Sequence, residues 1–124
     1  MKLLIVDDSS VIRSRIARIS NESRLSNLNI IGLAKNGNEA VRICKVMQPD
    51  LVTMDLTMPE MDGVSCIAEL IGMHPDMNIL VISALSDRTT ALQALKLGAR
   101  GFLNKPFSDK QLIDALMEFQ GAKE

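Results

Sequence analysis

The chain has 124 residues, of which 47% are hydrophobic and 23% are charged, and its formal net charge is -1. This length suits a single domain, and the composition is typical of a globular protein rather than a disordered one. The nearly neutral charge argues against the basic surface that binding to duplex DNA requires. We therefore expect one compact domain that does not bind nucleic acid directly.

The N-terminal apolar run, residues 3–6, ends at Asp7 and Asp8, which is too early for the apolar region of a signal peptide. No apolar run is long enough to span a membrane. We therefore expect a soluble, cytoplasmic protein. Cys44 and Cys66 lack CxxC spacing and have no neighbouring His, so both are interpreted as reduced packing residues.

Short apolar runs alternate along the chain with longer segments of helical periodicity. The runs predict strands at residues 3–6, 30–34, 51–54, 79–82 and 101–103. Strict alternation of strands and helices indicates an α/β fold, a parallel sheet with helices on both faces. Five strands favour the flavodoxin-like, doubly wound order 2-1-3-4-5, with residues 1–124 forming one domain.

The first helical segment has an apolar face and a set of arginines on its other faces, which we interpret as a solvated surface. The apolar residues are Ile12, Ile16 and Ile19, and the arginines are Arg13, Arg15 and Arg18. The polar residues 20–27 that follow are expected to form a loop rather than a domain boundary.

The four later helices are predicted from their capping residues. The second follows Asn36, the third follows Asp62 and the fourth follows Asp87. The last opens with a capping-box spacing from Ser108 to Gln111. The residues expected to pack are Val41, Ile43, Val46 and Met47 in the second helix and Leu112, Ile113, Leu116 and Phe119 in the last.

Polar side chains follow four of the predicted strands at the point where each strand ends. Asp7 and Asp8 follow the first strand, Asp55 follows the third, Ser83 ends the fourth and Lys105 follows the fifth. In open α/β sheets, ligands bind outside the carboxyl ends of the strands. Strands one and three are neighbours in the predicted order, about 4.8 Å apart, so we expect Asp8 and Asp55 to reach the same small ligand.

Three carboxylates at one sheet edge repel one another, and a bound cation relieves that repulsion. An all-oxygen donor set favours Mg²⁺, which usually takes one or two carboxylates and keeps several waters. We predict Asp8 and Asp55 as direct ligands, the main-chain carbonyl of Thr57 as a third, and Asp7 as a residue that orients the site through water. Considered alone, the Asp7-Asp8 pair would equally fit a charged turn that caps the first helix.

Lys105 and Ser83 complete a site for phosphoryl transfer. The side chain of Lys105 can cover much of the roughly 10 Å that two strand spacings place between it and Asp55. Its ammonium would neutralise one phosphoryl oxygen, and the Ser83 hydroxyl, helped by the Ala84 main-chain N–H, would meet another. The predicted reaction is an in-line attack by Asp55 that yields an aspartyl phosphate. The bond between Lys105 and Pro106 is left open as trans or cis.

These residues closely resemble the receiver domain of two-component response regulators, across essentially the whole chain. The matching segments are residues 4–9 (LIVDDS), 54–63 (MDLTMPEMDG), 83–84 (SA) and 98–106 (GARGFLNKP). The resemblance implies that a histidine kinase or a small phosphodonor supplies the phosphoryl group to Asp55. It also implies that Ser83 shifts toward the phosphoryl oxygen and that Phe102, which replaces a frequent Tyr, changes rotamer with it.

No residue follows Glu124, so we expect no attached output domain and an output through another protein. In this the chain is similar to stand-alone, chemotaxis-type receivers, in which the partner binds to the fourth helix, the fifth strand and the fifth helix. The resemblance places Ala91, Phe102, Asn104 and Phe107 on that surface. A core position for Phe107 fits the sequence equally well.

Two further residues are predicted to set the lifetime of the phosphorylated form. In the receivers that the chain resembles, side chains two residues beyond the acceptor Asp and two beyond the hydroxyl residue flank the path of the hydrolysing water. Here they are Thr57 and Leu85. Leu85 offers no hydrogen bond and Thr57 is shorter than Asn or Gln, so we expect slow dephosphorylation.

Other classes of function share some of these features. A magnesium-dependent phosphohydrolase of the haloacid-dehalogenase type also uses an Asp nucleophile, but places its acidic metal pair late in the chain and needs a cap insertion. A flavodoxin-like nucleotide carrier would need a glycine-rich phosphate loop, which is missing here. An unphosphorylated adaptor would not need the acids or Lys105. His74 is interpreted as an ordinary surface residue. We therefore expect a signalling switch that catalyses only its own phosphorylation and dephosphorylation, and chemotaxis as a candidate pathway.

Overall fold

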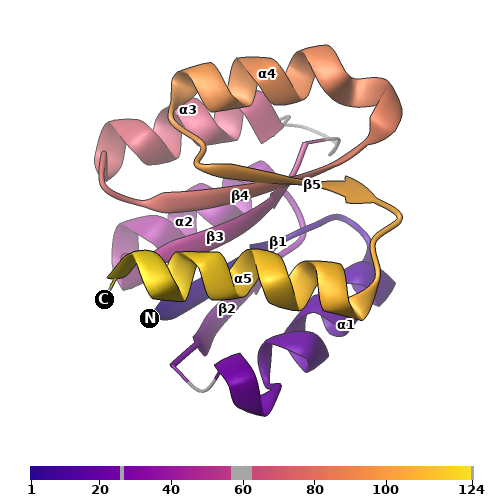
Figure 1. Ribbon diagram of the computed structural model, residues 1–124. Helices are drawn as coiled ribbons and strands as arrows, with labels where there is room; N and C mark the ends of the chain where they lie inside the picture. Colours follow the sequence, from indigo (N-terminus) through magenta and orange to yellow (C-terminus); the bar gives the residue numbers. More distant parts are fainter. Residues whose placement is uncertain (26, 57–62, 124) are drawn as a thin grey trace.

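The computed structural model describes residues 1–25, 27–56 and 63–123. Strands and helices alternate along this part of the chain (Figure 1). The strands are β1 (Lys2–Val6), β2 (Asn29–Ala34), β3 (Leu51–Asp55), β4 (Asn78–Ala84) and β5 (Gly101–Lys105). The helices are α1 (Ser10–Ser20), α2 (Gly37–Met47), α3 (Gly63–Met73), α4 (Arg88–Leu97) and α5 (Asp109–Lys123), with short 3-10 turns η1 (Ser23–Leu25) and η2 (Leu85–Asp87).

The sheet is parallel and has the order β2-β1-β3-β4-β5, which confirms the prediction. Figure 1 shows α1 and α5 over one face of the sheet and α2, α3 and α4 over the other. Successive side chains of β1 point to opposite faces of the sheet. Leu3 and Ile5 pack against α1 and α5, whereas Leu4 and Val6 pack against α2 and α3. All four are buried, as expected for a parallel sheet covered on both sides.

Two of the predicted helix starts have the expected side-chain bonds. The Ser108 hydroxyl accepts a hydrogen bond from the Gln111 main-chain N–H at 3.1 Å, and the Gln111 amide oxygen accepts one from the Ser108 N–H at 2.8 Å, which completes the capping box of α5. Asn36 caps α2 by accepting from the Glu39 N–H at 2.8 Å. Asp87 lies at the N-cap of α4 but makes no capping hydrogen bond. Asp62 lies outside the described residues.

The predicted packing role of Val46 and Met47 is wrong. The buried face of α2 is formed by Ala40, Val41 and Cys44, whereas Val46 is 76% exposed and Met47 is also exposed. At about 100° per residue, Val46 lies roughly 200° around the helix from Cys44, so both cannot face the sheet. The apolar character of Val46 and Met47 alone did not indicate which face of α2 they occupy.

Both cysteines are free and buried, as predicted. Burial raises the pKa of the Cys44 thiol to about 12, so it stays protonated and unreactive at neutral pH. None of the helices in the described part of the chain combines the length and apolar character needed to cross a lipid bilayer.

Candidate functional site

The carboxyl edge of the sheet brings three acidic side chains together. Because β1 and β3 are neighbours, Asp7 and Asp8 after β1 meet Asp55 at the end of β3. One carboxylate oxygen from each lies within 4.8 Å of the others. Asp7 and Asp55 are buried and Asp8 is exposed, so the cluster opens to solvent on the Asp8 side.

The ammonium of Lys105 lies between the two buried acids. Its Nζ is 3.2 Å from Asp7 Oδ2 and 3.4 Å from Asp55 Oδ1, so the side chain reaches across the width of β4 as predicted. Burial alone would lower the pKa of Lys105, but the attraction of Asp55 and Asp7 outweighs it and raises the pKa above its usual value. The lysine therefore carries its charge at neutral pH. The bond that joins it to Pro106 is cis.

Main-chain and helix contacts hold Asp7 in place. Its Oδ1 accepts a hydrogen bond from the Ser9 N–H at 2.9 Å, and Ser9 in turn caps α1 by accepting from the Ile12 N–H. Arg13 Nη1 donates to the Asp7 carbonyl at 2.6 Å. This last contact corrects the interpretation of Arg13 as solvated, because the first turns of α1 lie beside the acidic cluster.

The Ser83 hydroxyl is available for a ligand. Ser83 is the last residue but one of β4, in register with Asn104 of β5, and is buried. Its Oγ has no hydrogen-bond partner among the residues that the structure describes. A buried hydroxyl without a partner carries an energetic cost, which a ligand at the site would relieve.

Gly63 shows how tightly the start of α3 fits against this edge. A Cβ atom at Gly63 would lie 2.5 Å from the Leu56 Cα and 2.7 Å from the Asp55 carbonyl oxygen. The Gly63 N–H also donates to the Leu56 carbonyl at 3.0 Å. Any larger residue would therefore displace the end of β3 that carries Asp55.

An open depression of about 500 Å³ surrounds the cluster, and part of its lining was not predicted from the sequence. The lining residues are Asp8, Asp55, Ala84, Ser86, Asp87 and Lys105. Asp87 was interpreted only as a helix cap and Ser86 was given no role, although their place directly after β4 could have indicated this edge. Thr57 lies outside the described residues, and only the main chain of Leu85, in η2, is described.

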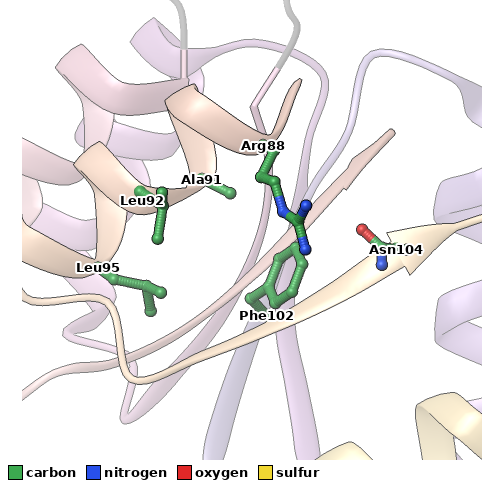
Figure 2. A pocket seen from close by; sticks show the side chains of 6 residues that line it. All are labelled: Arg88, Ala91, Leu92, Leu95, Phe102 and Asn104. Atoms are coloured by element: carbon green, nitrogen blue, oxygen red, sulfur yellow. The ribbon is translucent and has the colours of Figure 1, made fainter. Parts of the chain in front are cut away.

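A second hollow, of about 260 Å³, lies between α4 and β5 (Figure 2). We call it the α4–β5 groove. Its lining residues are Arg88, Ala91, Leu92, Leu95, Phe102 and Asn104. Figure 2 shows the two leucines of α4 on one side, the ring of Phe102 on the other, and Arg88 extended toward that ring.

Three of the four residues predicted for a partner surface line this groove, and the fourth does not. Ala91, Phe102 and Asn104 line it, and Phe102 is 42% exposed. Phe107 is 4% exposed and packs in the core beneath α1 and α5. Of the two positions left open for Phe107, the core position is therefore correct and the surface position is wrong, because its ring lies on the face of the sheet opposite α4.

The family model of the response regulator receiver domain matches residues 3–117. The chain belongs to this family. It is 38% identical to the chemotaxis protein CheY of Thermotoga maritima over 93% of both chains, and 37% identical to CheY of Listeria monocytogenes over 94% of this chain and 95% of that one. These similarities confirm the predicted resemblance and favour a signalling role over the phosphohydrolase and nucleotide-carrier alternatives.

The fold agrees with solved receiver structures. The CheY chain in a CheX-CheY-BeF3-Mg²⁺ complex from Borrelia burgdorferi superposes with a TM-score of 0.88 at 31% identity, covering 97% of this chain and 89% of that one. The chain is therefore a CheY-like receiver domain, which places it in phosphorylation-dependent signal transduction.

Proposed function

We propose that the chain is a switch that accepts a phosphoryl group on Asp55 in a Mg²⁺-dependent reaction and thereby changes its affinity for a protein partner. The phosphodonor is a histidine kinase or a small molecule such as acetyl phosphate. The observation that carries the proposal is the position of the Lys105 ammonium between Asp7 and Asp55. On the intervening strand lies the Ser83 hydroxyl, which has no hydrogen-bond partner among the residues described by the structure.

The acidic cluster suits a magnesium ion. Three carboxylates face one ammonium, so the cluster keeps an excess of negative charge that a divalent cation would neutralise. All its donors are oxygens, the ligand type that Mg²⁺ prefers. Asp8 and Asp55, with the Thr57 carbonyl, would hold the ion, and Asp7 would orient it through water. When bound, the ion supplies positive charge to the phosphoryl oxygens.

The residues of the chain divide the chemistry among them. A carboxylate oxygen of Asp55 forms a bond to phosphorus while the bond from phosphorus to the donor breaks and the donor leaves with the electron pair. With acetyl phosphate the leaving group is acetate. The Lys105 ammonium neutralises charge on one phosphoryl oxygen, and the Ser83 hydroxyl donates a hydrogen bond to another.

The α4–β5 groove supports the second half of the proposal, an output through another protein. Ser83 moving toward the phosphoryl group would disturb β5, because its register partner is Asn104, which also lines the groove. Because Phe102 has no phenol hydroxyl, it cannot respond to the movement of Ser83 by forming a hydrogen bond. A change in how its ring packs in the groove would transmit the movement instead. The partner surface would comprise α4, β5 and α5.

Intact mass spectrometry tests the acceptor residue. Purified protein incubated with acetyl phosphate and Mg²⁺ should gain the mass of one phosphoryl group, and Asp55→Asn should gain none because an amide is not a nucleophile of this kind. Asp50→Asn, at the opposite end of β3, is the matched control and should gain as much as wild type. An equal gain in Asp55→Asn would refute the assignment.

A further inference from the structure

We propose that Arg15 is a positioning residue for Lys105, and that with Arg13 it braces the two loops that carry the charges of the phosphoryl site. We call this pair the arginine brace. The inference rests on the proposed function, since it concerns how the same site is kept in its working geometry. It also explains why two arginines predicted to be solvated are instead partly buried.

Arg15 contacts the segment that follows Lys105 in three ways. Its Nη2 donates to the main-chain carbonyl of Phe107 at 2.6 Å. Its guanidinium carbon lies 4.6 Å from the centre of the Phe107 ring, a cation–π distance. Its Nε and Nη2 also donate to Asp109 Oδ1 at 3.3 and 3.0 Å. The guanidinium thus holds the short connection between β5 and α5 by its main chain and its side chains.

This connection determines where the Lys105 ammonium lies. Only Pro106 separates Lys105 from Phe107, and the ring of Phe107 is buried in the core. Lys105 is the last residue of an edge strand, so the sheet supports it through β4 alone. Movement of the connection would therefore move the ammonium away from Asp7 and Asp55.

Arg13 makes the corresponding contact on the other loop of the site. Its Nη1 donates to the Asp7 carbonyl at 2.6 Å. In α1, Arg13 thus binds the Asp7 carbonyl and Arg15 binds the Phe107 carbonyl. Helix α1 therefore sets the distance between Asp7 and the segment that carries Lys105. The two loops come from opposite ends of the sequence, and the contacts that tie them together lie outside the sheet.

The chemistry of this position requires arginine rather than any cation. A guanidinium offers several N–H donors in a fixed plane and stacks on an aromatic ring, whereas an ammonium is a point charge. The ion pair with Asp109 is half-exposed and contributes little by itself. The contacts with Phe107 are therefore the ones that give Arg15 its positioning role.

Arg18 provides a matched control on the same helix. It also pairs with Asp109, at 3.7 Å, but its side chain is 66% exposed, and within the described part of the chain no hydrogen bond or cation–π contact joins it to Phe107. Arg15→Gln and Arg18→Gln remove the same charge from the same helix. Only the first removes the hydrogen bond to the Phe107 carbonyl behind Lys105.

The test is the rate constant for phosphorylation of Asp55 by acetyl phosphate at saturating Mg²⁺, with folding checked by circular dichroism. Since a shift of about 1 Å in a reacting group can cost about a hundredfold, we expect Arg15→Gln to lose about tenfold. Arg18→Gln should lose no more than about twofold. Arg15→Lys, the milder variant if Arg15→Gln is unstable, should also be slower than Arg18→Gln. Equal rates for the Arg15 and Arg18 variants would overturn the inference.

A double-mutant cycle separates positioning from general damage. In a Lys105→Ala background the ammonium is gone, so Arg15→Gln should slow the reaction by no more than about twofold further. A tenfold loss in both backgrounds would show that Arg15 acts independently of Lys105 and would overturn the inference. Wild type that takes up no phosphoryl group would instead refute the proposed function.

A spectroscopic readout needs no phosphorylation. The ¹³Cε signal of Lys105, assigned by its absence from Lys105→Ala, should move in Arg15→Gln and stay in place in Arg18→Gln. A Lys105 signal unchanged in Arg15→Gln would overturn the inference even if the reaction were slower.

Discussion

The Lys105 ammonium stays charged in a partly buried position because its ion pairs with Asp55 and Asp7 compensate for the loss of hydration. The raised pKa of Lys105 fixes the sign of its contribution to stability. A lysine whose pKa is raised by folding stabilises the native state below its ordinary pKa of about 10.4, and that stabilisation is lost as the pH rises through the folded value. Changes of pH near neutrality therefore leave both the charge of the ammonium and its contribution to stability unaltered.

Thr57 and Leu85 are predicted to control how long the phosphoryl group stays on Asp55. In-line hydrolysis needs an oriented water, and neither side chain is suited to orient one. The double variant Thr57→Asn, Leu85→Glu supplies an amide and a carboxylate, so phosphorylated protein should decay about tenfold to a hundredfold faster than wild type. The decay is measured after removal of the phosphodonor. Equal half-lives, or a more persistent double variant, would contradict this role.

The strands β4 and β5 are predicted to carry the signal from Asp55 to the α4–β5 groove. Beryllofluoride with Mg²⁺, a mimic of the phosphoryl group, should shift NMR signals throughout residues 84–107, because Ser83 pulls on the strand that holds Asn104. In Ser83→Ala the shifts in β5 should largely disappear. Coupling of this kind typically changes partner affinity by about 1 to 3 kcal/mol. Shifts confined to the loops of Asp8 and Asp55 would exclude the relay.

The helices show where sequence reasoning reaches its limit. The capping box at Ser108 was predictable because both of its bonds are local. The partners of Arg15 were not, since Phe107 and Asp109 are distant in sequence and no local pattern links them to α1. Phe107 itself could be placed only once α1 and α5 were seen to share one face of the sheet.

Magnesium should stabilise the whole molecule in proportion to how well the acidic cluster binds it. A ligand at a hundred times its dissociation constant adds about 2.7 kcal/mol to the free energy of unfolding. Wild type should therefore melt at a higher temperature with Mg²⁺ than with EDTA. Asp8→Asn should gain much less, and in EDTA it should be at least as stable as wild type because one repelling charge is gone.

Circular dichroism is the suitable measurement for these melts because the chain has no Trp or Tyr to report unfolding by fluorescence. Asp114→Asn is the control, since that residue pairs with Lys110 on the exposed face of α5. Its gain from Mg²⁺ should match that of wild type. An equal gain in Asp8→Asn would indicate that the ion binds elsewhere.

The architecture as a whole was the most predictable feature. Alternating strands and helices, with right-handed crossovers, leave few possible sheet orders, and strand ends fix which polar residues share an edge. The sequence therefore indicated Asp7, Asp8, Asp55, Ser83 and Lys105 together. The place of Ser86 and Asp87 directly after β4 indicates that they lie near this edge. The sequence did not indicate that they line the depression, because that depends on how η2 and α4 pack.

The acids and the lysine of the site lie far apart in the sequence, and this has a consequence for a protein under synthesis. Asp7 follows the first strand, whereas Lys105 ends the last one. Domains fold as units, so a nascent chain that lacks β5 exposes its acids without the ammonium that completes them. If Asp55 is the acceptor, as proposed, such a chain would take up a phosphoryl group more slowly than the complete domain. Under the proposed function, competence to receive the signal is thus acquired only once β5 has been made, and nascent copies without β5 would compete poorly for the phosphodonor.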